Sequence, residues 1–353
     1  MPLLKRSINV HFFTKIICAL ILVVILLLLP FIIRDPYWIH IFISAGINAI
    51  LAMGFVMLHS TGLVTLGAAA FWATGAYAST MLVIKAGLSV WISILLGGII
   101  TAIIATGIGA VTVRLSKVAF VFLTIVVGAI VVLIVGRIDY FGGWGGIVRI
   151  PRPNPITLPV ITIDFSTKAQ YYYFILVILI LNIVVFYALY NSRIGRTWRA
   201  IKLNLRLAKT LGINSFRYSL LAFVVAAIFA SFAGSFYAHY MHTIEPDTFG
   251  FHKSVYIQVY GILGGMEYYI MGPVVGAIIM TILPEILRVT KEIEPIITGA
   301  ILVIVVILLP GGFLSLPQIV RASTSVLKDN MLLTLLRNKV SSKERVDHGD
   351  TGS

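Results

Sequence analysis

The chain has 353 residues, of which 59% are hydrophobic and 11% are charged, and its mean hydropathy is +1.02. Soluble domains carry about 25% charged residues, so this composition excludes a water-soluble globule and indicates a polytopic membrane protein. The single cysteine, Cys18, excludes a disulfide framework and a cysteine-based zinc site. The net charge of +14 would suit nucleic acid, but in a chain this apolar it marks the cytoplasmic side instead, so we expect no nucleic-acid partner.

Apolar stretches long enough to cross a bilayer follow one another along the chain, since a helix needs roughly 20 such residues to span the hydrocarbon core. They lie near residues 14–33, 38–58, 64–84, 90–113, 118–136, 171–190, 217–240, 254–270, 271–288 and 295–312. The first is predicted to be an uncleaved span, because it is long and no small-residue cleavage site follows it. The third contains Gly62, Gly67 and Gly75 and is predicted to be broken or re-entrant. The fold class is therefore an all-α polytopic membrane protein of about ten transmembrane helices.

Basic residues set the expected orientation, because cytoplasmic loops carry an excess of Lys and Arg. The N-terminal segment, the turn with Arg114 and Lys117, residues 191–218 and the C-terminal tail are all basic, and ten spans place all four on one side. We expect both termini in the cytoplasm. The predicted organisation is a cytoplasmic segment 1–13, a transmembrane domain 14–317 and a cytoplasmic tail 318–353. The transmembrane domain includes an outer loop at 137–170 and a cytoplasmic loop at 191–217.

The predicted spans contain almost no ionisable side chains well inside them. A charge at membrane depth is costly and is retained for proton relays, ion coupling or catalysis. The sequence also lacks the HExxH, GxSxG and GxxxxGK[ST] motifs. We therefore expect no catalytic residue, no metal site, no cofactor bound by this chain and no ATPase site of its own, so the chain is not expected to be an enzyme.

Small residues are abundant in the predicted spans, and most are interpreted as sites where helices pack closely. Glycines beside helix-breaking residues have a second interpretation, because broken helices at membrane depth expose their backbone only where they line a cavity. These glycines and the nearby weakly polar residues are the candidate translocation path: Asn48, Ser60, Thr61, Gly62, Thr65, Gly67, Thr74, Gly264 and Gly265.

The cytoplasmic loop contains a predicted helix from Thr197 to Leu211, with Gly212 at its C-terminal cap. One face carries apolar residues at helical spacing, namely Ile201, Leu205, Ala208 and Leu211. The other face is basic. Two interpretations remain open, a surface helix held by anionic membrane lipid and a coupling helix that docks on a soluble partner.

Several short motifs follow one another in a fixed order along the chain. The first half contains Gly62–Gly67, Ala69–Phe71, Gly75–Tyr77, Gly142–Gly143, Gly146–Ile147 and Ile150–Pro151. The second half contains Ser192–Arg196, Arg199–Ile201, Leu211–Asn214, Arg217–Tyr218, Leu220–Phe223, Ala233–Gly234, Tyr237–His239, Pro246–Asp247, Ile262–Gly265, Gly272–Ala277 and Leu283–Glu285. Together, over about residues 40–312, they resemble the LivM-type branched-chain amino acid ABC transporter permease family, which implies a place in the bacterial cytoplasmic (inner) membrane.

The resemblance implies the permease subunit of an ABC importer. The implied partners are a second, LivH-like permease subunit, two cytoplasmic ATP-binding subunits that carry ATP and Mg, and an extracytoplasmic solute-binding protein. The implied substrate is a branched-chain amino acid. The helix in the cytoplasmic loop would transmit the movement of the ATPases, with these coupling residues: Arg193, Gly195, Arg196, Arg199, Ala200, Ala208 and Gly212.

The chain departs from the family in the same loop. Acidic residues usually follow the Arg-Ala-Ile stretch, but here Leu203, Asn204, Leu205 and Lys209 stand there, so the docking face is expected to be basic. Two alternatives remain open for the function: a permease for urea or short amides, and an ATP-independent secondary carrier or facilitator. An intramembrane enzyme is disfavoured by the missing catalytic groups.

Overall fold

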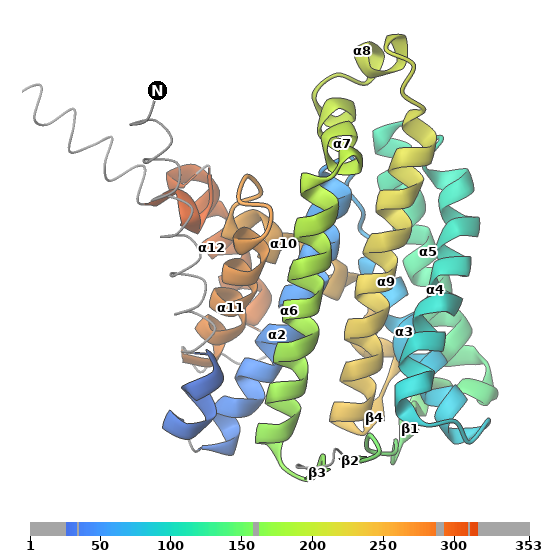
Figure 1. The fold of residues 1–353 in the computed structure, drawn as a ribbon, viewed down its shortest axis with the longest axis vertical. Helices are drawn as coiled ribbons and strands as arrows, with labels where there is room; N and C mark the ends of the chain where they lie inside the picture. Colours follow the sequence, from blue (N-terminus) through green and yellow to red (C-terminus); the bar gives the residue numbers. More distant parts are fainter. Residues whose placement is uncertain (1–25, 34, 158–161, 287–292, 310, 317–353) are drawn as a thin grey trace, which may run out of the picture.

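The computed structural model describes residues 26–33, 35–157, 162–286, 293–309 and 311–316, and within them the fold is a bundle of α-helices (Figure 1). Five helices are long and apolar enough to cross a membrane: α2 (Pro36–His59), α4 (Val90–Thr112), α5 (Lys117–Arg137), α6 (Lys168–Asn191) and α9 (Ser215–Met241). The shorter helices are α3 (Ala68–Ile84), α7 (Arg193–Leu203), α8 (Leu205–Thr210), α10 (Phe251–Gly264), α11 (Met271–Ile286) and α12 (Glu294–Leu308). The all-α membrane architecture expected from composition is thus supported, whereas the count of ten spans stays a prediction.

The predicted spans at the chain ends are described only in part. Residues 26–32 are helical, and the rest of the first predicted span, together with segments 1–13 and 318–353, lies outside the described residues. The predicted span 254–270 extends too far, because α10 ends at Gly264. Gly265 then adopts φ +106°, a backbone conformation that only glycine reaches without strain and that no helix continues through.

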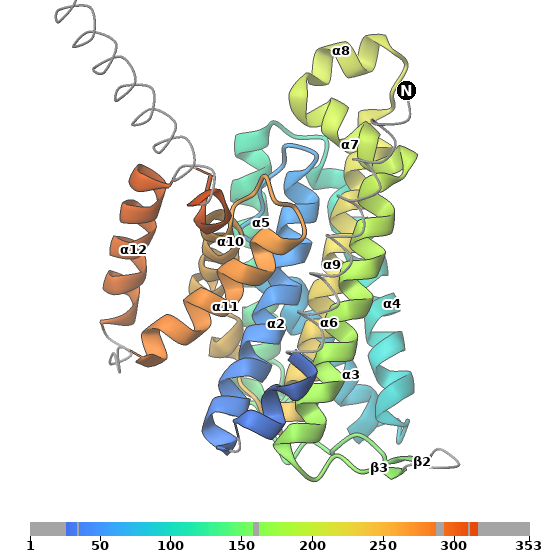
Figure 2. The same ribbon diagram turned by 60° about the vertical axis from the view of Figure 1, so that its left-hand side comes forward.

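Helix α2 lies at the centre of the bundle and packs against α6, α9, α10 and α11. On one side α9 also contacts α3 and α4, and α5 covers α3 from the outside. α12 stands at the edge of the bundle beyond α11 (Figure 2). Because α2 is surrounded by helices, 89% of its most apolar 18-residue stretch is buried. The corresponding stretch of α5 is only 17% buried.

The loops gather at two opposite ends, as the charge pattern predicts. At one end β1 (Ile147–Val148) pairs antiparallel with β4 (Thr243–Ile244), and the β2 (Ile156–Thr157) and β3 (Thr162–Ile163) hairpin lies nearby (Figure 1). The Lys168 ammonium donates to the Pro36 carbonyl at the same end (3.2 Å). At the other end the α4–α5 turn and the α7–α8 segment line one cavity. The two basic loops therefore share an end, while its assignment to the cytoplasm stays a prediction.

The close crossing between α3 and α9 is built from small residues. A Cβ on Gly75 would collide with the Ser231 backbone, and a Cβ on Gly234 would collide with the Trp72 carbonyl. The Ser235 hydroxyl donates to the Gly75 carbonyl across the crossing (3.0 Å). Close backbone approach of this kind drives helix association in lipid, where apolar burial adds little. The expectation that many of the small residues serve packing is confirmed here.

The crossing predicts that Gly234→Ala destabilises the protein, because the added methyl group forces α3 and α9 apart. Overpacking a close contact costs about 1–3 kcal/mol, so the thermal unfolding temperature in detergent should fall clearly below that of the wild type. Gly107→Ala on the exposed side of α4 is the matched control, since a Cβ there meets nothing within 4 Å. Equal unfolding temperatures for the two variants would contradict this account of the crossing.

Candidate functional site

The most irregular buried part of the bundle is the segment between α2 and α3. Residues 61–67 are non-helical, yet Thr61 and Thr65 are buried. The irregularity predicted for the third span is confirmed at its start, with Gly62 at φ +81° where the chain leaves α2, whereas α3 continues through Gly75 without a break. Buried backbone groups that leave a helix need new hydrogen-bond partners, most of all in a membrane protein.

Side chains from two other helices supply those partners. The Thr124 hydroxyl of α5 accepts a hydrogen bond from the Leu66 N–H (3.2 Å), and the Gln258 side-chain amide of α10 donates to the Thr65 carbonyl (2.8 Å). The Ser254 hydroxyl, also of α10, accepts from the Ala69 N–H at the start of α3 (3.0 Å). The segment is thus tied to α5 on one side and to α10 on the other.

Gly67 is the closest point between this segment and α5. A Cβ at this position would collide with the Thr124 carbonyl, so only glycine allows the chain to pass so near the helix. Its N–H bonds the Thr65 hydroxyl (3.1 Å), which closes a local turn before α3 begins. The sequence analysis named Gly67 and Thr65 as path residues; the structure shows them stabilising the irregular segment, and their role in a path stays a prediction.

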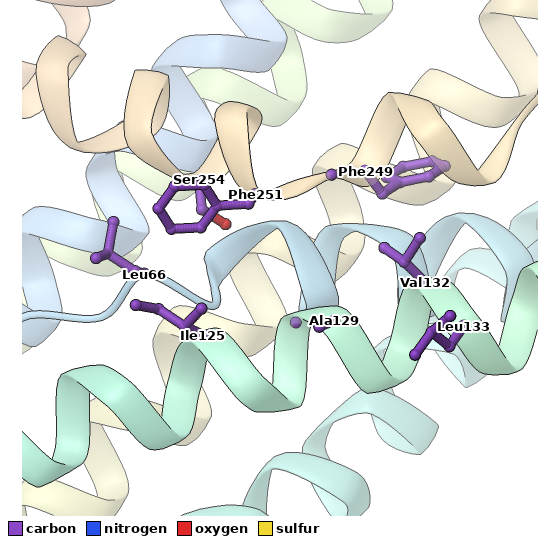
Figure 3. Close-up of a pocket in the computed structure, with 10 residues that line it drawn as sticks. Leu66, Ile125, Ala129, Val132, Leu133, Phe249, Phe251 and Ser254 are labelled. Carbon is purple, nitrogen blue, oxygen red and sulfur yellow. The ribbon is translucent and has the colours of Figure 1, made fainter.

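A cavity of about 320 Å³ lies where this segment, α5 and the start of α10 meet. Ile125, Ala129, Val132 and Leu133 form the α5 wall, and Phe249, Phe251 and Ser254 form the opposite wall (Figure 3). Leu66, from the broken segment, lies at one end of the cavity (Figure 3). The lining is therefore almost entirely apolar, with the Ser254 hydroxyl as its one polar side chain. Such a cavity accepts a small apolar group and orients it through few polar contacts.

The predicted path residues are spread along the bundle. The Asn48 side chain, in the middle of α2, donates to the Thr281 hydroxyl of α11 (2.9 Å). The hydroxyls of Ser60, Thr61 and Thr74 each donate to a carbonyl within their own helix or its last turn. Gly264 and Gly265 lie where α10 ends against α11. A Cβ on Gly264 would collide with the Gly272 carbonyl. The structure therefore does not bring these nine residues together, and their role as a path remains untested.

Sequence reasoning missed the residues that hold the broken segment, Thr124, Ser254 and Gln258. A signal for two of them was present, because Ser254 and Gln258 are four residues apart and share one face of a helix in an otherwise apolar stretch. Thr124 had no comparable signal. A lone threonine in a span is ordinarily satisfied by its own helix, and Thr124 does also donate to the Val121 carbonyl (2.8 Å).

The second candidate element, the basic loop after α6, forms two helices in place of the single predicted helix from Thr197 to Leu211. The break is at Asn204, whose backbone is extended (φ −153°, ψ 99°). Its side-chain carbonyl accepts a hydrogen bond from the Leu207 N–H (3.0 Å) and so caps α8. Asparagine favours such caps over helix interiors. The predicted C-terminal cap is confirmed, with Gly212 at φ +78°.

The break changes which residues of the loop are buried. Ile201 and Ala208 are buried as predicted, but Leu205 and Leu211 are 40% and 72% exposed. Leu203 and Leu207 are 86% and 57% exposed as well. The expected single apolar face is therefore wrong, and the loop presents leucines to the outside together with the exposed Arg193, Arg196 and Arg206.

Helix α7 is fixed firmly to the bundle. Gly195 is buried so close to the Tyr190 carbonyl that no Cβ fits, and the Trp198 indole donates to the Tyr218 carbonyl of α9 (2.8 Å). The Arg199 guanidinium lies over the Tyr190 ring (4.6 Å to its centroid). The Tyr190 ring in turn packs on that of Tyr269 in the α10–α11 turn, with centroids 4.3 Å apart. A movement of α7 would therefore be transmitted to α6, α9 and the end of α10.

Comparisons with known proteins agree on one family. The model of the branched-chain amino acid transport system permease component matches residues 37–309. The permease protein LivM of the high-affinity branched-chain amino acid transport system is 26% identical over 299 residues, both in Salmonella typhimurium and in Escherichia coli, with 79% of this chain and 68% of the relative covered. The permease protein LivH of Escherichia coli is 31% identical over 130 residues, or 36% of this chain and 42% of the relative. No solved structure matches the chain.

Replacing Thr124 with valine should destabilise the broken segment, because the Leu66 N–H would lose its partner in a buried place. An unsatisfied buried group costs about 1–3 kcal/mol, and the thermal unfolding temperature in detergent should fall accordingly. Thr124→Ser should retain most of the stability. Thr106→Val is the control, since that exposed hydroxyl bonds only its own helix. If Thr124→Val and Thr106→Val unfold at the same temperature, the hydroxyl does not hold the segment.

Proposed function

This chain belongs to the family of permease components of branched-chain amino acid transport systems, and we propose that it is the membrane-spanning permease subunit of an ABC importer for a branched-chain amino acid. The proposed place of action is the bacterial cytoplasmic membrane. ATP and Mg are bound by partner subunits in this scheme. The chain itself provides the passage and the surface on which the ATPases act.

The proposed assembly pairs this chain with a homologous permease. The support is that the chain is similar to both LivM and LivH, two permeases named as parts of the same kind of transport system. Homologous subunits pair most readily around an approximate two-fold axis. Two ATP-binding subunits and an extracytoplasmic solute-binding protein complete the proposed system.

The proposed coupling role rests on the structure of the α7–α8 segment. It is fixed to the bundle through Gly195, Trp198 and Arg199, and it exposes Leu203, Leu207 and Leu211 at the tip. Exposed leucines are favourable only when a partner covers them. We propose that these leucines dock into the ATPase, and that apolar contact takes the place of the acidic contacts usual in the family. The coupling residues Arg193, Gly195, Arg196, Arg199, Ala200, Ala208 and Gly212 would then position the docking surface.

The apolar cavity beside the broken segment favours a branched-chain amino acid over urea or a short amide. Its walls offer methyl and aromatic groups and one hydroxyl, whereas urea would leave hydrogen-bonding groups unpaired against them, at a cost of about 1–3 kcal/mol each. We propose that the aliphatic side chain of the amino acid passes along this cavity.

The reconstituted system tests the function directly. Proteoliposomes with all subunits should accumulate leucine, isoleucine or valine only when ATP and the binding protein are present, and liposomes with this chain alone should show no flux. Leu203→Asp combined with Leu207→Asp should abolish ATP-driven uptake and co-purification of the ATPases, because charges would replace the docking leucines. Thr210→Asp, on α8 with Leu207, is the control. Flux through the chain alone would establish the facilitator alternative and refute the ABC role.

The cavity predicts a second, independent result. Ala129→Phe should fill it and lower leucine uptake by about tenfold or more, a loss equal to about 1.4 kcal/mol, without lowering the unfolding temperature. Ile130→Phe is the matched control, because Ile130 is the neighbouring, 48% exposed residue of α5 and does not line the cavity. Equal uptake by both variants would place the passage elsewhere.

A further inference from the structure

A second cavity, of about 340 Å³, lies at the basic end of the bundle, away from the apolar cavity. It is enclosed by the α4–α5 turn, the start of α9 and one side of the α7–α8 segment. Arg114 of the α4–α5 turn, Lys117 at the start of α5 and Lys209 of α8 line it. Hydroxyl groups of Thr61, Ser116, Ser215 and Ser219 line it too.

The charged side chains that line this cavity are all positive. No acidic side chain is among its lining residues, and residues 191–218 contain no Asp or Glu at all. Two long helices, α5 and α9, also begin at the cavity, with Lys117 and Ser215 as their first residues. The first N–H groups of a helix lack partners within the helix, and the helix dipole adds positive potential there. Each of these features favours an anion.

Polar groups inside the cavity are still available to a ligand. The Ser219 side chain is only 6% exposed, yet it has no hydrogen bond within the described part of the chain. The Arg114 guanidinium is held at the cavity by the Phe216 ring (4.7 Å to the centroid). A Cβ on Gly62 would lie 3.4 Å from the Lys117 ammonium, which places this charge beside the buried segment. Cationic donors are thus assembled with no carboxylate among the lining residues.

The surroundings of the cavity indicate where the anion comes from. The cavity lies where α4 ends and α5 begins, two helices with the length and hydropathy of membrane spans. Directly beside it these helices expose Val111, Val118 and Phe122, each more than 60% accessible. Acyl chains would lie along this apolar surface while the headgroup reaches the cations. Basic pockets between transmembrane helices bind lipid headgroups in this way.

We propose that this cavity is a binding site for the phosphate group of an anionic phospholipid headgroup. Arg114, Lys117 and Lys209 supply the charge. Ser219 supplies a hydrogen bond, together with the first two N–H groups of α5 and α9, since the third of each is bonded to the cap side chain of Ser116 or Asn214. The proposed ATPase contact uses a different side of the same segment, because Leu203, Leu207 and Leu211 do not line the cavity. The lipid site does not depend on the proposed transport function.

Native mass spectrometry of the purified full chain tests the proposal. Phosphatidylglycerol should bind tightly, and phosphatidylcholine with the same acyl chains should bind only weakly. Removing one lining charge should weaken phosphatidylglycerol binding by about fivefold, and the triple variant Arg114→Gln, Lys117→Gln, Lys209→Gln by about 100-fold. The swap Arg114→Lys, Lys117→Arg, Lys209→Arg should retain most of the binding, which separates charge loss from misfolding.

A control variant with the same net charge distinguishes a site from general surface attraction. Arg193→Gln, Arg196→Gln, Arg206→Gln removes three exposed charges from the same loop, none of which lines the cavity. It should bind phosphatidylglycerol nearly as well as the wild type. The proposal would be overturned if both triple variants lost phosphatidylglycerol binding to the same extent. It would also be overturned if phosphatidylcholine bound the wild type as tightly as phosphatidylglycerol.

Two further measurements distinguish a bound phospholipid from a soluble anion and from a docked protein. Inorganic phosphate at millimolar concentration should not displace the lipid, because it lacks acyl chains to pack on Val118 and Phe122. Complete displacement would assign the cavity to a soluble anion and overturn the lipid. If the cavity variants lost ATPase co-purification and kept normal lipid binding, the cavity would be a protein-docking site and the proposal would be wrong.

Discussion

The hydrogen bonds that hold residues 61–67 are the constraint on which the rest of the bundle depends. A non-helical segment inside a membrane bundle must find partners for its peptide groups, because neither lipid nor a neighbouring turn provides them. Thr124, Gln258 and Ser254 provide them here, from α5 and α10. The three elements are therefore fixed relative to one another, and the apolar cavity opens at the place where they meet.

The same constraint links the two ends of the molecule. Helix α10 begins at the apolar cavity and ends at Gly264, where the turn to α11 carries Tyr269. Tyr269 packs on Tyr190, and Tyr190 lies beneath Arg199 of α7. A continuous series of ring and backbone contacts therefore runs from the basic loop to the helix that borders the cavity. In the proposed ATP-driven importer, a shift of α7 would act on the cavity wall through these contacts.

The long spans were predictable because their physical cause is local. The stretches expected at 38–58, 90–113, 118–136, 171–190 and 217–240 correspond to α2, α4, α5, α6 and α9 within three residues at each end. The irregular segment at Gly62 and Gly67 was also predictable, since glycine weakens a helix, but Gly75 was not distinguishable from them although α3 continues through it. Its partner Thr124 was not, because nothing in the sequence says which of several lone threonines faces a broken segment. The end of α10 at Gly265 depends on its close approach to Gly311 and Gly312 across the turn, which is a tertiary contact.

Asn204 shows why an amphipathic pattern alone misplaced the faces of the basic loop. Helical spacing continues from Ile201 to Leu211, so periodicity favours one helix, but the asparagine side chain competes for the Leu207 N–H and starts a second helix. That break turns α8 so that Leu205 and Lys209 line the basic cavity while Leu203, Leu207 and Leu211 stay exposed. An uninterrupted helix would have placed the leucines at positions 205 and 211 on one buried face. The break therefore leaves Leu203, Leu207 and Leu211 away from the cavity that Leu205 and Lys209 line, so the proposed ATPase contact and the proposed lipid site use different residues of one loop.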